Sequence, residues 1–240
     1  MTKPIFEIII LIGRPASGKS EIIDYLKRST DEKRRDAFHI GQLDFLDDFP
    51  MLWTWFEEDH ILENILGKPR LHTDKDGYFK DEYLWHLLIE RFNLDYPKRL
   101  REENYHDKKT LIIEFSRGSE HGGYTAAMSH LSKEILERAG IVYVDVPYAE
   151  SLRKNRRRFN PDRPDSILEH GLPDNKLERL YKEVDWEAFS SADPEFVTVN
   201  GVKVPYAVFA NEDDVTTDTP DLLAERLEEV LHKLWDLKNQ

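Results

Sequence analysis

The sequence contains no cysteine among its 240 residues, which excludes disulfides, thiolate zinc sites and cysteine nucleophiles. Basic side chains are also outnumbered, 34 against 47 acidic ones, so the formal net charge is −13. Proteins that follow a nucleic-acid backbone need a surplus of Lys and Arg to displace counterions. The charge balance therefore argues against a nucleic-acid partner, and the missing cysteines favour a cytosolic protein.

Long apolar runs are missing as well. No window approaches the roughly 18 apolar residues of a membrane span, so we expect no membrane contact. The apolar N-terminal stretch MTKPIFEIIILIG lacks a small-residue cleavage site and leads into a glycine-rich turn and a charged helix, unlike a secretory signal. The histidines show no metal-ligand spacing.

Apolar residues nevertheless make up 40% of the chain, enough for a folded core. Residues 8–12 (IIILI) form a run typical of a strand buried on both faces of a parallel sheet. We expect five strands, at 8–12, 37–43, 110–115, 141–146 and 206–210. Helices are expected at 20–28, 123–139, 148–159 and 219–238. This alternation predicts an α/β fold with a parallel sheet covered on both sides.

Two shorter features refine this prediction. Valine-rich segments at 197–199 and 202–204 flank Asn200-Gly201, a dipeptide typical of a type I′ hairpin. Thr219 precedes Pro220, as a capping residue precedes a proline in the first helical turn. The interval 45–109 is rich in aromatic and charged residues and predicts a mainly helical insertion.

The clearest motif is a phosphate-binding loop of the form G-x-x-x-x-G-K-[ST]. Its residues are Gly13, Arg14, Pro15, Ala16, Ser17, Gly18, Lys19 and Ser20. The two glycines allow successive N–H groups to turn toward a phosphate. Lys19 supplies a cation for the β- and γ-phosphate oxygens, and the Ser20 hydroxyl can ligate Mg²⁺. Because a buried strand precedes the motif and a helix follows it, we predict binding of a nucleoside triphosphate.

Other motifs narrow the class of phosphate-loop protein. A GTPase needs an Asp-x-x-Gly switch and an Asn-Lys-x-Asp base reader, but Asn175-Lys176 is followed by Leu177-Glu178. ATP-driven machines need long additional elements, for which this chain has little room. A small-molecule kinase fits better.

From about residue 6 to residue 234 the chain resembles the adenylate-kinase-like branch of P-loop kinases, which includes nucleoside, nucleoside monophosphate, shikimate and gluconate kinases. The resemblance implies one domain over 1–240 with a three-layer P-loop NTPase fold and a five-stranded parallel sheet in the order 2-3-1-4-5. It also implies an acceptor-binding insertion after strand 2 (45–109), a lid after strand 4 (150–175), and ATP and Mg²⁺ as cofactors.

Arginines follow the fourth expected strand. Arg153 and Arg157 are four residues apart, so they share a helix face and can converge on one polyphosphate. By resemblance, one lies against the adenine and the other contacts phosphates, and Arg163 adds charge from the lid loop. The alternative is a solvated helix face with ordinary salt bridges.

Carboxylates follow the second and third expected strands. Glu114 ends a buried strand, where it can hold Mg²⁺ or accept a proton from the substrate. Arg117 resembles the arginine of the acidic–arginine pairs in nucleoside kinases, or else forms a salt bridge with Glu114. Asp44, which precedes Asp47 and Asp48, is either the general base or a helix cap.

Two further groups have open roles. The aromatic residues of the insertion can sandwich a nucleobase or form helix core; they are Phe45, Phe49, Trp53, Trp55 and Phe56. Asn211 starts a stretch similar to the Asn-Asp stretch of guanylate-kinase-like proteins. That likeness implies that Asn211 lies near the adenine of the phosphoryl donor. The alternative is that Asn211 belongs to a polar turn before a helix.

These features predict ATP- and Mg²⁺-dependent phosphoryl transfer to a small-molecule acceptor, with a nucleoside or nucleotide favoured. The expected catalytic residues are Lys19, Asp44, Glu114, Arg117 and Arg157. One alternative is a regulatory or assembly ATPase that uses the insertion to bind a protein. A polynucleotide-end kinase is a further alternative, which the net charge disfavours.

Overall fold

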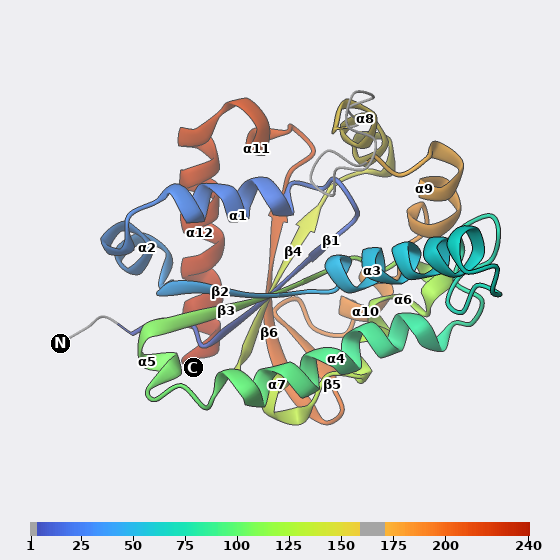
Figure 1. Ribbon diagram of the computed structural model, residues 1–240. Helices are drawn as coiled ribbons and strands as arrows, with labels where there is room; N and C mark the ends of the chain where they lie inside the picture. The colour runs from blue at the N-terminus through green and yellow to red at the C-terminus, as the bar shows by residue number, and fades with distance from the viewer. Residues whose placement is uncertain (1–3, 159–170) are drawn as a thin grey trace.

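The computed structural model describes residues 4–158 and 171–240. Strands within these residues form a six-stranded sheet in the order β2-β3-β1-β4-β6-β5 (Figure 1). They are β1 (Ile8–Gly13), β2 (Gln42–Asp47), β3 (Lys109–Phe115), β4 (Ala139–Asp145), β5 (Phe196–Val199) and β6 (Val202–Ala210). Because β2, β3, β1, β4 and β6 are all parallel, the predicted order 2-3-1-4-5 is confirmed, with β6 as the fifth strand.

The described sheet has one strand more than the predicted five. β5 pairs antiparallel with β6, and the turn between them has positive φ at Asn200 (50°) and Gly201 (77°), as a type I′ turn requires. The second arm of this hairpin continues directly into the fifth parallel strand. Pro205, which lacks an N–H, fits there because pairing with β4 begins only at Tyr206.

The prediction of the second strand at 37–43 was wrong. Phe38 ends helix α2 (Asp31–Phe38), and β2 starts at Gln42. The chain turns between them through His39, which has φ 52°, and Gly41, where a Cβ would lie 2.4 Å from the Lys108 carbonyl oxygen. β2 is an edge strand in which only Leu46 is buried, so it lacks the apolar run that marks the inner strands.

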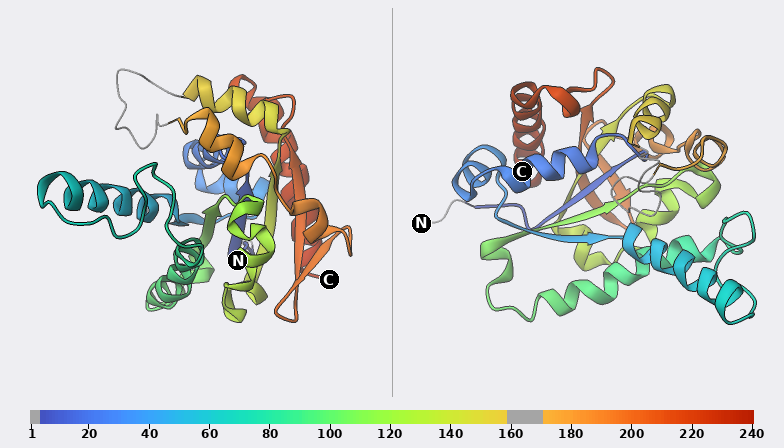
Figure 2. Two further views of the ribbon diagram at one scale, coloured as in Figure 1. Left: turned by 90° about the vertical axis from the view of Figure 1, so that its right-hand side faces the viewer. Right: turned by 45° about the horizontal axis from the view of Figure 1, so that its top comes forward.

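Helices cover both faces of the sheet and produce three layers (Figures 1 and 2). One face carries α1 (Lys19–Arg28), α2 and α12 (Pro220–Lys238). The other carries α4 (Tyr83–Arg99), α6 (Gly123–Ser129), α7 (Lys133–Arg138) and α10 (Trp186–Ser190). Successive side chains of β1 alternate between the two cores, because neighbouring side chains of a strand point to opposite faces.

The remaining described elements lie mostly around the carboxyl ends of the parallel strands. They are α3 (Phe49–His60), the π-helix η1 (Ile61–Ile65), α5 (Tyr105–Lys108), the 3₁₀-helix η2 (Ser119–His121), α8 (Tyr148–Arg158), α9 (Asp174–Tyr181) and α11 (Val215–Asp218). None of the helices in the described ranges combines the length and the apolar character needed to cross a membrane.

Two helix predictions need correction. The expected helix 123–139 is divided into α6 and α7, because the Ser132 hydroxyl accepts a hydrogen bond from the Ile135 N–H and begins a new helix. Thr219 does not cap α12, since its hydroxyl donates to the Val215 carbonyl at 2.9 Å. Pro220 occupies the first turn of α12 as expected.

Residues 49–82 form an arm that projects from the sheet (Figure 2, left). A small core containing Trp55 and Trp85 packs this arm against α4. At its far end the fully buried Asp59 carboxylate accepts hydrogen bonds from the N–H groups of Leu71 and Thr73, both at 2.6 Å. Asp59 therefore anchors the segment that returns from η1 toward the sheet.

We expect Asp59→Asn to lower the free energy of unfolding by about 2 kcal/mol at neutral pH, because the amide replaces a charged acceptor with a group that opposes the N–H donors. Burial alone would raise the pKa of Asp59, but hydrogen bonds from Thr73, Leu71 and His72 lower it to about 2. This folded-state pKa is below the unfolded value of about 3.9, so the contribution is complete above pH 4 and is lost as pH falls toward 2.

Urea unfolding at pH 7 and pH 3 measures this contribution, which should shrink at the lower pH. The exposed Asp24, which pairs with Arg28 on its own helix, provides the control variant Asp24→Asn, with an expected change below about 0.5 kcal/mol. Equal losses for the two variants would contradict the anchoring role of Asp59.

Candidate active site

The loop between β1 and α1 depends on its two motif glycines. Gly18 has φ 113°, and a Cβ there would lie 2.6 Å from Asn211 Nδ2. A Cβ on Gly13 would lie 2.6 Å from the Val144 carbonyl oxygen. Side chains at either position would strain the loop. The sequence motif therefore folds into a tight turn before α1, as phosphate binding by backbone N–H groups requires.

Lys19 lies buried at the start of α1, with 6% of its surface exposed. Its Nζ donates to Ser116 Oγ at 2.8 Å and to the carbonyl oxygens of Arg14 at 3.1 Å and Gly13 at 3.3 Å. Burial lowers the pKa of Lys19, while Glu114, 3.9 Å away, opposes that shift. The ammonium is thus held mainly by neutral acceptors, which a phosphate can replace.

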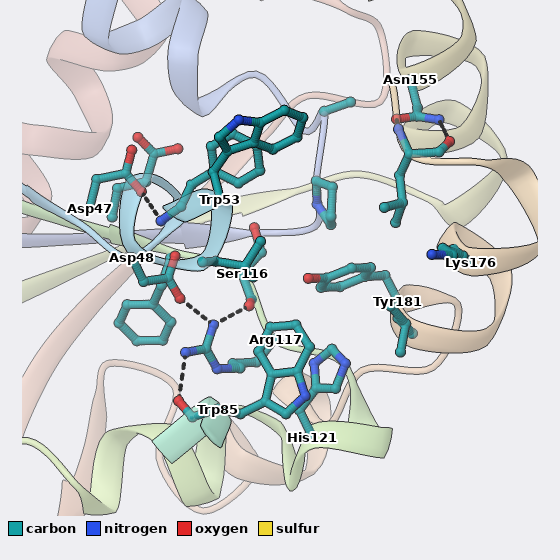
Figure 3. A pocket seen from close by; sticks show the side chains of 18 of the residues that line it. Asp47, Asp48, Trp53, Trp85, Ser116, Arg117, His121, Asn155, Lys176 and Tyr181 are labelled. Atoms are coloured by element: carbon teal, nitrogen blue, oxygen red, sulfur yellow. Dashed lines mark hydrogen bonds and ion pairs between the residues drawn. The ribbon is translucent and has the colours of Figure 1, made fainter. Parts of the chain in front are cut away.

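A cavity of about 690 Å³ extends from this loop to the arm (Figure 3). Its walls are the loop and start of α1, the ends of β2 and β3, parts of α3 and α4, and α9. Residues that line it include Ser17, Lys19, Ser20, Asp47, Asp48, Trp53, Tyr78, Trp85, Glu114, Ser116, Arg117, His121, Asn155, Arg158, Lys176 and Tyr181. The phosphate loop and the aromatic side chains of the arm therefore share one cavity.

Asp47 and Glu114 end two neighbouring strands and are directly paired in register. Partial loss of hydration at the strand end raises the pKa of Asp47 to about 7, together with the charges of Glu114 and Asp48, although the residue stays exposed to solvent. Burial also raises the pKa of Glu114, with Lys19 opposing it. The two carboxyl groups hold their protons more tightly than isolated ones, so a cation beside them would favour their charged forms.

Asp44, the residue expected to act as base or cap, does not line the cavity. Its Oδ2 accepts hydrogen bonds from Arg99 at 3.1 Å and from the Tyr105 hydroxyl at 2.9 Å. It lies within β2 rather than after it, and Asp48 is the residue that precedes α3. The misplaced strand led the sequence analysis to Asp44 instead of Asp47.

Arg117 is buried at the end of β3, with 1% of its surface exposed. Its Nη1 forms an ion pair with Asp48 Oδ2 at 2.6 Å, and its Nη2 donates to the Trp85 carbonyl oxygen at 3.1 Å (Figure 3). The sequence analysis gave a salt bridge between Arg117 and Glu114 as the alternative to a catalytic role. In the structure, Arg117 forms its ion pair with Asp48 instead. Arg117 therefore connects the starts of α3 and α4 to the sheet.

The lid arginines are arranged differently from the prediction. Arg153 pairs with Glu150 and Asp214, both at 2.6 Å, on the exposed side of α8. Neither it nor Arg157 lines the cavity, whereas Arg158 does. Arg163 lies outside the described residues. The side of α8 that faces the phosphate-binding loop carries Ser151, whose hydroxyl donates to the Pro15 carbonyl oxygen at 2.7 Å.

Two other residues predicted to contact the nucleotide form hydrogen bonds to backbone groups of the protein. The Arg14 guanidinium donates to the carbonyl oxygens of Val146 at 2.9 Å and Tyr181 at 3.2 Å, so it connects the end of β4 to α9. Asn211 is fully buried, and its amide donates to the Ser17 carbonyl oxygen at 2.8 Å. Arg14 and Asn211 both brace the loop in this structure.

The aromatic residues of the insertion divide between core and cavity. Trp55 belongs to the small core of the arm, and Phe45 packs beneath the Lys27 ammonium, 4.6 Å from the ring centroid. The three that line the cavity are Phe49, Trp53 and Phe56. Further aromatic lining comes from residues that sequence analysis missed: Tyr78, Phe79, Trp85, His121 and Tyr181.

His121 stacks on Trp85 with ring centroids 3.8 Å apart and meets Tyr181 edge-on at 5.2 Å. Burial and the Arg117 charge lower the pKa of His121 to about 3, so the imidazole is neutral at physiological pH. Its Nδ1 accepts the Gly118 N–H at 3.3 Å. Scattered aromatic residues from α4, η2 and α9 thus form one continuous wall, which no spacing rule reveals.

Tyr78 of the arm meets α9 across the cavity mouth. Arg179 lies over its ring at 4.1 Å and Lys176 at 5.1 Å. Lys176 also donates to the Gly77 carbonyl oxygen at 3.3 Å. Segments about one hundred residues apart therefore close one side of the cavity.

The sequence matches no family model and has no significant similarity to a curated protein. Solved structures that the chain matches include a sugar kinase from Janibacter sp. HTCC2649, at 14% identity over 97% of this chain and 98% of that one, with a TM-score of 0.43. Another is shikimate kinase from Acinetobacter baumannii in complex with shikimate, at 14% identity over 95% and 94%, with a TM-score of 0.44. The chain's own elements define a three-layer α/β fold with a phosphate-binding loop between β1 and α1.

We expect Asp48→Asn to destabilise the protein by about 3–5 kcal/mol, because it leaves the Arg117 charge buried without its carboxylate partner. Chemical unfolding monitored by circular dichroism measures the change. Asp44→Asn is the control, since the Arg99–Asp44 pair is about one-quarter to one-third exposed and should contribute less. A smaller loss for Asp48→Asn than for Asp44→Asn would contradict the importance of the buried pair.

Proposed function

We propose that the protein is an ATP- and Mg²⁺-dependent kinase that phosphorylates a hydroxyl group of a small molecule. The observation that carries this proposal is the shared cavity, in which a phosphate-binding loop and an aromatic compartment meet at Asp47 and Glu114. A phosphate-binding loop alone would support nucleotide binding or hydrolysis. A second compartment beside it, lined by aromatic side chains, supports transfer to an acceptor other than water.

The residues of the loop suit a triphosphate. Lys19 exchanges its carbonyl and Ser116 contacts for phosphate oxygens, and the N-terminus of α1 favours the negative charge. Ser20 and Glu114 would hold Mg²⁺, Ser20 directly and Glu114 through water. Arg158 adds positive charge from α8. Bound Mg·ATP supplies the γ-phosphoryl group, whose developing charge these cations stabilise.

Asp47 replaces Asp44 as the proposed general base. It lies at the strand end next to Glu114, between the loop and the aromatic compartment. Ionised Asp47 would accept the proton of the acceptor hydroxyl as the hydroxyl oxygen bonds to the γ-phosphorus, while the bond from that phosphorus to the β–γ bridging oxygen breaks and ADP leaves. Arg117 holds Asp48 and α3 and thereby positions Asp47. Arg153, Arg157 and Asn211 have no proposed contact with the reacting groups.

The acceptor class that we favour is a nucleoside or nucleotide. Aromatic rings line the compartment on several sides, including Trp53, Trp85 and Tyr181 (Figure 3). Flat aromatic surfaces suit a planar heterocycle, which gains stacking energy on them. We further propose that the protein acts in the cytosol and on small molecules, with the insertion and core forming one domain.

A regulatory ATPase is the second candidate. The tip of the arm exposes four apolar side chains, Ile61, Ile65, Leu66 and Leu71, which would suit a protein partner. The two functions differ in what stimulates ATP consumption. A kinase needs a small hydroxyl compound, whereas a regulator needs a protein.

The first experiment incubates the protein with Mg·ATP and pools of nucleosides, nucleotides, sugars and hydroxy acids, and measures ADP release and product mass. We expect one pool to yield a product heavier by about 80 Da, the mass of one transferred phosphoryl group. Lys19→Ala should abolish this product. ADP release that no pool stimulates, with ATP binding retained, would contradict the kinase proposal and favour the regulator.

With that acceptor identified, we expect kcat/KM at saturating Mg·ATP to rise with pH as Asp47 loses its proton and then to level off, because a general base acts only when deprotonated. Loss of hydration and the charges of Glu114 and Asp48 raise the pKa of Asp47 to about 7 in the protein without ligand. Bound Mg²⁺ favours the carboxylate form, so the rise should lie below pH 7. Asp47→Asn should lower kcat by about 10²- to 10⁴-fold and remove this pH dependence.

The matched control is Asp44→Asn, which changes the same residue type three positions earlier on β2. It should leave kcat and the pH profile nearly unchanged, since Asp44 lies outside the cavity. A larger loss of kcat for Asp44→Asn than for Asp47→Asn would restore Asp44 as the base.

A further inference from the structure

A buried polar cluster lies behind the phosphate-binding loop, on the side away from the cavity. At its centre is Asn211, which comes directly after β6 and is fully buried. The Asn211 Nδ2 donates to the Ser17 carbonyl oxygen at 2.8 Å and to Thr216 Oγ1 at 2.9 Å. Ser17 lines the cavity and Asn211 does not. Asn211 therefore contacts the loop from behind.

The bonded carbonyl belongs to the peptide that joins Ser17 to Gly18. Ser17 is followed by Gly18, whose φ of 113° is accessible mainly to glycine. In a trans peptide the C=O and N–H groups point in opposite directions, and the described chain contains no cis bond. Holding the Ser17 carbonyl on Asn211 therefore directs the Gly18 N–H away from the cluster and toward the cavity.

Thr216 and Lys154 fix the orientation of the Asn211 amide. Thr216 Oγ1 accepts from both Asn211 and Lys154 Nζ, the latter at 2.9 Å, while the Thr216 N–H donates to Asn211 Oδ1 at 3.4 Å. Lys154 also pairs with Asp214 at 2.7 Å. Only one assignment of the amide satisfies both contacts, with nitrogen toward Ser17 and oxygen toward the Thr216 N–H.

The space around Gly18 supports the same conclusion. A Cβ at Gly18 would lie 2.6 Å from Asn211 Nδ2 and 2.8 Å from Thr216 Oγ1. The Asn211 and Thr216 side chains therefore fill the volume that a side chain at Gly18 would need. The glycine of the motif and the polar cluster behind it form one packed unit.

We propose that Asn211 is a positioning residue for nucleotide binding, which holds the Ser17–Gly18 peptide so that the Gly18 N–H faces the phosphates. This role differs from the adenine contact expected from the sequence. It rests on the proposed function only in requiring that a nucleotide binds at the loop. It does not depend on the acceptor or on phosphoryl transfer.

The test measures the dissociation constant of Mg·ATP by calorimetry, without acceptor, together with thermal stability. Asn211→Asp keeps the shape of the side chain but replaces the donor with an oxygen facing the Ser17 carbonyl. We expect the dissociation constant to rise by about tenfold or more, because a buried carbonyl loses its donor and the peptide can rotate.

The matched control is Asn93→Asp. Asn93 has the same pattern of bonds far from the loop, with Nδ2 donating to the His130 carbonyl at 2.7 Å and Oδ1 accepting the Ser132 N–H at 2.8 Å. It should lose stability but keep its affinity for Mg·ATP. An unchanged dissociation constant in Asn211→Asp would overturn the proposal, as would an equal loss of affinity in Asn93→Asp.

A second pair of variants covers the case in which Asn211→Asp does not fold. Thr216→Ser keeps the hydroxyl that orients Asn211, and Thr216→Val removes it. We expect the serine variant to bind Mg·ATP like the wild type and the valine variant to bind more weakly. Equal binding by both would overturn the proposal. If the wild-type protein bound no Mg·ATP, the proposed function would fail together with this proposal. If the wild type bound Mg·ATP and the variants bound it equally well, only the role of Asn211 would fail.

Discussion

The parallel register of β2, β3 and β1 is the constraint on which the rest of the structure depends. Parallel strands all end at the same edge of a sheet, so the loops that leave their carboxyl ends lie together. At this edge the phosphate-binding loop after β1 meets Asp47 and Glu114, which are paired in register at the ends of β2 and β3. Lys19 lies 3.9 Å from Glu114 because the loop that leads to Lys19 leaves β1, which is the neighbour of β3. Groups from separate parts of the sequence thus become one site.

Burial then divides the charges at this edge into two kinds. Arg117 and Asp48 neutralise each other and connect the arm to the sheet. At Lys19 and Glu114, burial instead disfavours the charged forms, and at Asp47 loss of hydration and the neighbouring carboxylates do so. A polyphosphate would stabilise charged Lys19, and a divalent cation would stabilise the two carboxylates. The Arg117–Asp48 pair therefore stabilises the fold. Lys19, Asp47 and Glu114 suit a ligand that carries both negative and positive charge.

The compartment beside the loop depends on contacts between distant segments. The arm has its own small core around Trp55 and Trp85, and Asp59 anchors its returning segment. Tyr78 meets α9 through cation–π contacts, while the loop is braced from behind by Asn211. Contacts within the protein therefore support the cavity on both sides, which suits the proposed reaction between two bound molecules.

The sequence by itself determined the phosphate-binding loop, four of the five parallel strands, the β5–β6 hairpin and, through a family resemblance, the strand order. These features depend on local backbone preferences and on apolar runs. It missed β2, because an edge strand with only Leu46 buried has no such run, and so it selected Asp44 over Asp47. Helical periodicity placed Arg153 and Arg157 on one face but left open which face turns inward. Only the tertiary structure decided which carboxylate, arginine and aromatic rings reach the cavity, because register and helix rotation are set by packing against segments remote in the chain.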